Sequence, residues 1–215
     1  MSNDNDLKQA VLAELDWEPS VTSAHIGVTA NSGVVTLSGH VENYAAKKHA
    51  EMAAGRVRGV KAIVEELEVR LPGFVKKHDD EIAAAALDRF AWAVSVPDDA
   101  IKVKVEKGWV TLTGQVDWYF QKEAATREVR DLSGVLGVND NMTIKPGVNV
   151  GDVSNDITHA LHRAWFEPRT ITVSAVGGTI KLSGTTHSWI DRHEAELTAW
   201  AAPGATAVEN NIAVV

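Results

Sequence analysis

The chain has 215 residues, of which 45% are hydrophobic and 23% charged. This composition is typical of a soluble globular protein of one or two ordinary domains, or of several small ones. The 21 basic and 29 acidic residues give a net charge of −8, and no third of the chain is net basic, which argues against nucleic-acid binding and weakens attachment to an anionic membrane. There is no cysteine, so disulfides, thiol nucleophiles and zinc–thiolate sites are excluded.

The first six residues, MSNDND, are polar and acidic. A secretory signal would have a basic start followed by an apolar stretch, and no apolar run in the chain approaches the ~20 residues that span a bilayer. If Met1 is the initiator methionine, we therefore expect a cytoplasmic protein that does not span a membrane.

One glycine-bounded pattern occurs three times, at residues 33–39 (GVVTLSG), 108–114 (GWVTLTG) and 178–184 (GTIKLSG). Alternation with period two predicts a strand that has Val35 and Leu37 on one face. The glycines predict a tight turn before the strand and a sharp exit after it. The same spacing carries beyond the strand, since a shift of 75 residues also maps Trp17 onto Trp92. We therefore divide the chain into repeats one, two and three, at residues 1–71, 72–146 and 147–215.

Each repeat begins with a predicted helix that has apolar residues on one face: Leu7, Val11 and Leu15, then Ile82, Ala86 and Phe90, then Ile157, Leu161 and Trp165. A proline follows each of these helices, as is common after a helix end: Pro19, Pro97 and Pro168. A hairpin comes next, with its first strand at 26–30, 101–105 or 171–175 and a left-handed glycine ending its turn. A second helix starts near Glu42, Asp117 or His187, and a third strand covers 60–69, 135–144 or 205–214.

The order αββαβ predicts an α+β fold of three tandem two-layer sandwiches. Each sandwich would be a three-stranded mixed sheet with two helices on one face. The second helix links two strands of one sheet, so these strands should run parallel with a right-handed connection.

These residues resemble the BON domain, a family named for bacterial osmotically inducible and nodulation proteins. The resemblance rests on the glycine-bounded strand, on the aromatic-containing helix after it, and on the pairs Gly59-Val60 and Gly134-Val135 before the last strand. Repeat three departs at Lys181 and Ala205, where the pattern has threonine and valine. The resemblance implies a non-enzymatic module of osmotic stress and envelope integrity that contacts phospholipid, here in the cytoplasmic, multi-copy subgroup.

Three consecutive aromatic residues, Trp118, Tyr119 and Phe120, open the second helix of repeat two, and they cannot all face one way on a helix. Tyr119 aligns with Tyr44 and Trp189, so we expect it to be structural. Trp118 and Phe120 have no aromatic counterparts, and at least one of them is expected to be exposed, where it would contact a partner or lipid. Packing between repeats is the alternative.

Trp109 stands in the second strand of repeat two, where the other repeats have Val34 and Thr179. Its place in the alternation predicts that it lies on the outer face of the sheet, away from the helices. There it would either dock against a sister repeat or contact a ligand.

Four histidines fall in repeat three: His159, His162, His187 and His193. A metal site needs three or more ligands with supporting partners, and no acidic residue stands at a telling spacing, so we interpret them as surface histidines and predict no metal. The sequence contains no phosphate-binding loop, nucleophile elbow or HExxH motif. We therefore predict no catalytic residue and no cofactor.

The sequence thus predicts a non-enzymatic, stress-associated binding or scaffolding protein that contacts a protein partner or a phospholipid surface. Two alternatives stay open. A small-ligand carrier would require a deep apolar cavity, and a histidine-dependent enzyme would require three of the four histidines of repeat three to converge on one cleft.

Overall fold

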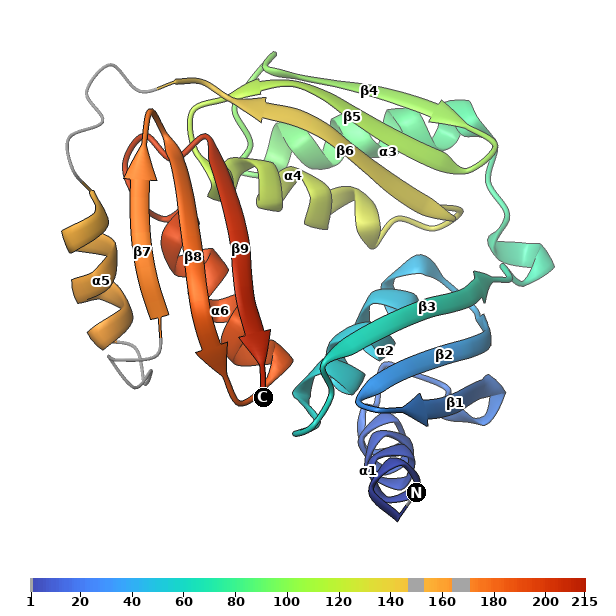
Figure 1. Ribbon diagram of the computed structural model, residues 1–215. Coiled ribbons are helices and arrows are strands. Elements are labelled where there is room, and N and C mark those ends of the chain that lie inside the picture. Colours follow the sequence, from blue (N-terminus) through green and yellow to red (C-terminus); the bar gives the residue numbers. More distant parts are fainter. Residues whose placement is uncertain (1, 147–152, 164–170) are drawn as a thin grey trace. The chain divides into compact units, whose positions relative to one another are not determined.

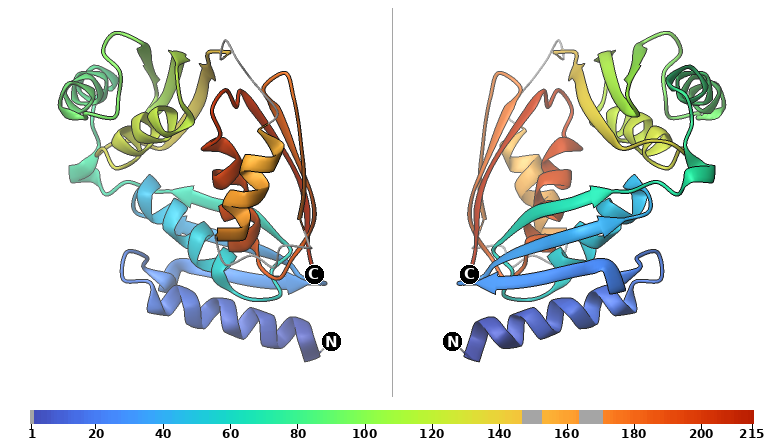
Figure 2. Two further views of the ribbon diagram at one scale, coloured as in Figure 1. Left: turned by 90° about the vertical axis from the view of Figure 1, so that its left-hand side faces the viewer. Right: turned by 90° about the vertical axis from the view of Figure 1, so that its right-hand side faces the viewer.

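The computed structural model describes residues 2–146, 153–163 and 171–215, without the side chains of residues 2, 3, 74, 162 and 163. In these residues it has three separate three-stranded sheets, ordered β1-β2-β3, β4-β5-β6 and β7-β8-β9. The two helices of each repeat lie on one face of its own sheet (Figures 1 and 2). The predicted fold class, α+β with a mixed three-stranded sheet in each repeat, is confirmed.

The elements follow the predicted order in every repeat. Repeat one comprises α1 (Ser2–Trp17), β1 (Ile26–Asn31), β2 (Val34–Val41), α2 (Tyr44–Arg56) and β3 (Ala62–Val69). Repeat two comprises α3 (Asp79–Trp92), β4 (Ile101–Glu106), β5 (Trp109–Val116), α4 (Tyr119–Arg130) and β6 (Gly137–Ile144). Repeat three comprises α5 (Ser154–Arg163), β7 (Ile171–Val176), β8 (Thr179–Thr186), α6 (Trp189–Trp200) and β9 (Ala207–Val214). Short 3-10 turns, η1 (Ser23–His25) and η2 (Gly73–Val75), precede β1 and α3. Pro168, expected after the first helix of repeat three, lies outside the described residues.

A two-residue turn joins the antiparallel strands of each hairpin. Ser32 and Gly33 have φ angles of 53° and 86°, and Lys107 and Gly108 have 52° and 78°. Two consecutive left-handed residues are the hallmark of the type I′ turn, which matches the twist of the strands it joins. The expected left-handed glycine is therefore present, and the residue before it shares its conformation.

The second glycine of the pattern has a different role from the one we expected. Gly39 and Gly114 lie inside β2 and β5, each of which continues for two more residues, so the predicted sharp exit is wrong. Their φ angles are +116° and +140°, and a Cβ added at either would lie 2.1 Å from a backbone carbonyl oxygen, that of His25 or of Ala100. Glycine is needed here because the chain entering the first strand passes directly against the second.

The third strand runs parallel to the second in repeats two and three, as the crossover predicts. In repeat one the same direction follows from two backbone hydrogen bonds, Lys61 to Gly33 and Arg70 to Val41. The pairing of the third strand begins at the turn glycine, whose carbonyl oxygen accepts a hydrogen bond from the backbone just before that strand. The N···O distances are 2.8 Å from Lys61 to Gly33, 2.9 Å from Leu136 to Gly108 and 2.8 Å from Thr206 to Gly178. One glycine thus closes the hairpin and starts the parallel pairing.

The core of each repeat lies between its sheet and its two helices. The second helix contributes small residues that are completely buried: Ala50, Ala53 and Ala54 in α2, Ala125 in α4, and Ala195 and Ala199 in α6. Small side chains let a helix axis approach the sheet closely, so the space is filled by the large strand residues Val35 and Leu37 and their counterparts.

An acidic residue near the start of the first helix holds the hairpin turn. The Asp79 carboxylate accepts hydrogen bonds from the backbone N–H of Lys107 at 2.7 Å and of Gly108 at 2.9 Å. Asp4 accepts one from Ser32 at 2.9 Å. Because these N–H groups sit at the exposed end of the hairpin, the carboxylates satisfy donors that the sheet leaves unpaired.

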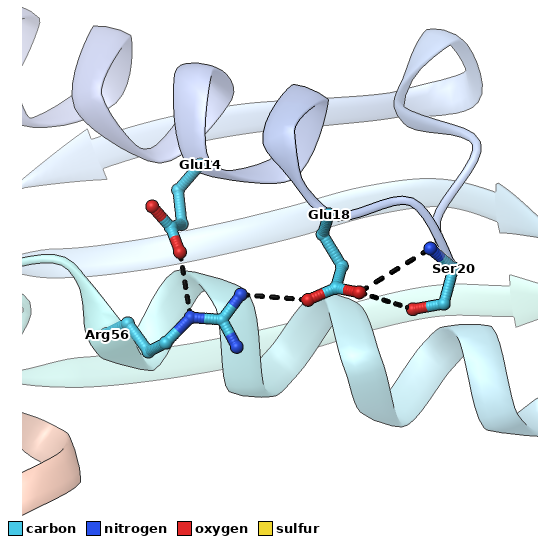
Figure 3. A network of polar contacts seen from close by, with 4 residues as sticks. All are labelled: Glu14, Glu18, Ser20 and Arg56. Carbon is cyan, nitrogen blue, oxygen red and sulfur yellow. Dashed lines mark hydrogen bonds and ion pairs between the residues drawn. The ribbon is translucent and has the colours of Figure 1, made fainter.

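Ion pairs join the first helix to the second. In repeat one, Arg56 of α2 contacts Glu14 at 2.7 Å and Glu18 at 2.9 Å, and Glu18 also accepts hydrogen bonds from Ser20 (Figure 3). The pKa of Glu18 is lowered to about 2, mainly by the hydrogen bond from Arg56 and next by that from Ser20. In repeat two the charges are exchanged, since Arg89 of the first helix contacts Glu128 of the second at 3.5 Å.

Candidate interaction surfaces

The histidines of repeat three do not form a site in the described part of the chain. His159 lies on α5, His187 in the turn after β8 and His193 on α6, and all three are exposed. The side chain of His162 lies outside the described residues. Among the residues that the structure describes, no group of three or more histidine, aspartate or glutamate side chains is placed to hold a metal ion.

The start of α4 exposes two of its three aromatic residues. Trp118 keeps 41% of its surface in contact with solvent and Phe120 keeps 56%. Tyr119, between them, is half-buried and donates a hydrogen bond from its hydroxyl to Glu123 at 3.0 Å. The structure therefore places both Trp118 and Phe120 at the surface.

In the other two repeats a capping residue stands where repeat two has Trp118. The side-chain oxygen of Asn43 accepts a hydrogen bond from the backbone N–H of Ala46 at 2.7 Å, and that of Ser188 accepts one from Asp191 at 3.1 Å. Both satisfy an N–H group in the first turn of the helix, which has no partner inside the helix itself. Asparagine and serine are among the residues most favoured at this position.

An indole has no acceptor for those N–H groups, because its nitrogen only donates. In repeat two Gln121 reaches back instead, and its side-chain oxygen accepts from the backbone N–H of Asp117 at 2.9 Å and of Trp118 at 3.0 Å. These bonds fix the chain that enters α4. The first-turn N–H group that a capping side chain would bind, that of Gln121, instead donates to the carbonyl oxygen of Trp118 at 3.2 Å. Trp118 therefore occupies a place where the local structure favours a different residue.

Trp109 lies on the outer face of its sheet, where the alternation placed it, and 47% of its surface is exposed. Its ring covers the paired position in β6, Gly137: a Cβ added there would lie 2.4 Å from Cζ3 of the indole. The ring thus packs on bare backbone on the outer face, and about half of the residue stays exposed to solvent.

The structure does not bring the three predicted contact residues together. Trp109 begins β5, whereas Trp118 and Phe120 follow its end. Seven residue steps along a strand span about 23 Å. They therefore form two surfaces, one at the hairpin end of the sheet and one at the start of α4.

Sequence reasoning missed a further pair of exposed residues. Trp17 is the last residue of α1 and Trp92 the last of α3, and they are 83% and 88% exposed. Both lie two residues beyond the last core residue of the helix, Leu15 or Phe90, and a step of two residues turns about 200° around a helix. Their equivalence was visible in the repeat, and helical phase would have shown that they face away from the core.

In the described residues, no helix combines the length and the apolar character that crossing a bilayer requires.

The fold defines a class of protein made of small αββαβ modules in tandem. The sequence profile of the BON domain matches residues 3–70, 78–146 and 149–215. The chain belongs to the BON domain family and contains three copies of the domain. Osmotically-inducible protein Y of Escherichia coli (strain K12) is 30% identical over 147 residues, which cover 66% of this chain and 73% of that protein.

Two solved structures of CdsD, a structural protein of the type III secretion system of Chlamydia trachomatis, also align with this chain. They are 15% and 17% identical to it, and the alignments cover 98% of this chain and 98% and 92% of theirs. The TM-score is 0.26 in both cases, so this likeness carries no argument about fold or function.

Proposed function

We propose that the protein is a non-catalytic binding protein of osmotic stress whose second repeat contacts its partner through Trp118 and Phe120, at the start of α4. Membership of the BON family and the similarity to an osmotically inducible protein support the stress association. The partner is a protein or a phospholipid surface, and the net charge of −8 favours a protein.

One observation carries the choice of surface: the capping position of α4 is occupied by an exposed tryptophan. Capping residues contribute about 1 kcal/mol to helix stability, and the two sister repeats keep them. Repeat two has lost this contribution and exposes an aromatic side chain in its place. Large aromatic side chains are the commonest anchors of protein interfaces because they bury much surface at a small cost in side-chain entropy.

The test is a substitution that separates stability from binding. Trp118→Ser restores the residue of repeat three, so we expect the free energy of unfolding of repeat two to rise by about 1 kcal/mol. Hydrogen exchange of the β5 and β6 amides measures it. Ser188→Ala is the matched control, because it removes the cap that Trp118→Ser would create and should lower the stability of repeat three by a similar amount.

Two assays measure binding. In a pull-down, the full-length protein is the bait in extracts of osmotically stressed cells. In a flotation assay, it is mixed with vesicles of phosphatidylglycerol and phosphatidylethanolamine. We expect Trp118→Ser to lose the partner that the unmodified protein retains, although the variant is the more stable of the two. Salt-sensitive co-flotation that disappears in the variant would identify phospholipid as the partner. Unchanged binding in both assays would contradict the proposed surface.

A further inference from the structure

Trp17 and Trp92 are the two most exposed tryptophans in the described chain, at 83% and 88%. Indole has the largest aromatic surface of any side chain, and on average most of it is buried in soluble proteins. The two residues occupy equivalent positions at the ends of α1 and α3. A single exposed indole needs no explanation, but the same one in two repeats of different sequence points to a shared use.

The end of α1 is electronegative. The last turn of a helix presents unpaired carbonyl groups that together carry a partial negative charge, and that of α1 contains no basic residue. Asp16, directly before Trp17, is exposed. Glu14 and Glu18 share the single positive charge of Arg56, so this cluster adds a net negative charge.

The end of α3 has a similar character. Asp88 is exposed in its last two turns, and the one basic residue there, Arg89, is paired with Glu128. The following loop exposes Asp98 and Asp99 before β4 begins. Each exposed indole thus ends a helix whose nearby exposed charges along the chain are mainly acidic.

An aromatic face next to negative charge attracts cations, and tryptophan is the side chain that binds them best. The same charges repel an anionic membrane. We infer that Trp17 and Trp92 are equivalent docking points that each bind a basic segment of a partner protein, with a lysine or arginine side chain stacked on the indole. This inference rests on other residues than the proposal for Trp118, so either can fail without the other.

The test uses the full chain and a fluorescently labelled peptide of alternating arginine and glycine, with binding followed by anisotropy. Trp17→Ala and Trp92→Ala should each weaken binding at their own docking point roughly two- to fivefold, as expected for one exposed cation–π contact, and the double variant should weaken it at both. Phenylalanine at these positions should retain part of the affinity. Asp16→Asn should weaken binding and reduce its salt dependence.

Val176→Ala is the control, because it removes an exposed apolar side chain that ends a strand and not a helix. It should leave peptide binding unchanged. Equal peptide binding by the double alanine variant and the unmodified protein would overturn the inference. A second result would also overturn it. If the unmodified protein does not bind the peptide but floats with phosphatidylglycerol vesicles, and if flotation requires Trp17 and Trp92, the surface is a lipid contact.

Discussion

Repeats one and two build the same sheet and the same helix pair, but they differ in what surrounds them. Both place a glycine against a carbonyl oxygen inside the second strand, at Gly39 and Gly114. On the outer face, repeat one has Val34 and Ala62 where repeat two has Trp109 and Gly137. Between the helices, repeat one has a glutamate–arginine–glutamate cluster and repeat two a single pair of opposite polarity.

This comparison separates what the fold requires from what it permits. The strand glycines are the same because no side chain fits between two backbones that approach so closely. The outer face and the helix-pair charges vary because each site can be filled by several combinations of residues. The same substitution at the shared glycine should therefore damage whichever repeat carries it, whereas a substitution at a variable position should have its effect in only one of the two repeats.

The largest effect is expected at the shared glycine. Gly39→Ala in repeat one and Gly114→Ala in repeat two would each place a methyl group 2.1 Å from a carbonyl oxygen at a strongly positive φ. Left-handed strain and the steric conflict together should cost about 3 kcal/mol. Hydrogen exchange should show lost protection in the sheet of the substituted repeat. Gly73→Ala, where an added Cβ meets nothing within 4 Å, is the control, and equal protection in all three variants would refute the steric account.

A smaller effect, confined to repeat two, is expected at the outer face. Gly137→Ala would push its Cβ into the ring of Trp109, and since the ring is half exposed it should move aside at a cost of about 1 kcal/mol. The double substitution Trp109→Val and Gly137→Ala reproduces the pair of repeat one and should remove that cost. A double-mutant cycle on urea unfolding measures the coupling. Additive effects would show that the ring does not rest on Gly137.

The smallest effect is expected at the helix pair of repeat one, and it depends on pH. The pKa of Glu18 is about 2 in the folded protein, against an ordinary value of 4.5. The unfolded chain therefore takes up the proton first on acidification, so the contribution of Glu18 is complete above about pH 4.5 and is lost as the pH falls towards 2. Arg56→Ala removes the main cause of the shift and should flatten this dependence.

Hydrogen exchange of the β1 and β2 amides at several pH values, corrected for intrinsic exchange rates, measures this change. Arg89→Ala in repeat two is the control and should leave the pH dependence of repeat one as it is. A slope in repeat one that Arg56→Ala does not alter would show that the pair contributes nothing in solution, as many exposed ion pairs do.

Much of the fold could be predicted from the sequence. Period-two alternation located the strands, four-residue spacing located the helices, and the connection between the second and third strands required them to be parallel. The Gly39 prediction failed because the pattern records that a glycine is present and not what lies against it. The carbonyl oxygen that excludes a side chain there belongs to His25, which directly precedes the first strand and is not part of the motif.

The candidate surfaces were predicted less completely. Trp109, Trp118 and Phe120 stood out because the sister repeats have other residues at those positions. Trp17 and Trp92 did not stand out because repeats one and two both have tryptophan at this position. Differences between repeats therefore did not point to it.

The sequence by itself determined the threefold repeat, the order of its elements and the faces that form each core, because these depend on periodicity along the chain. Only the tertiary structure decided how much of each aromatic side chain stays in solvent, that the indole of Trp109 rests on Gly137, and that the residues in the place of Trp118 cap their helices. Each of these depends on which atoms lie within contact range, and contact range is set by the folded chain and not by spacing in the sequence.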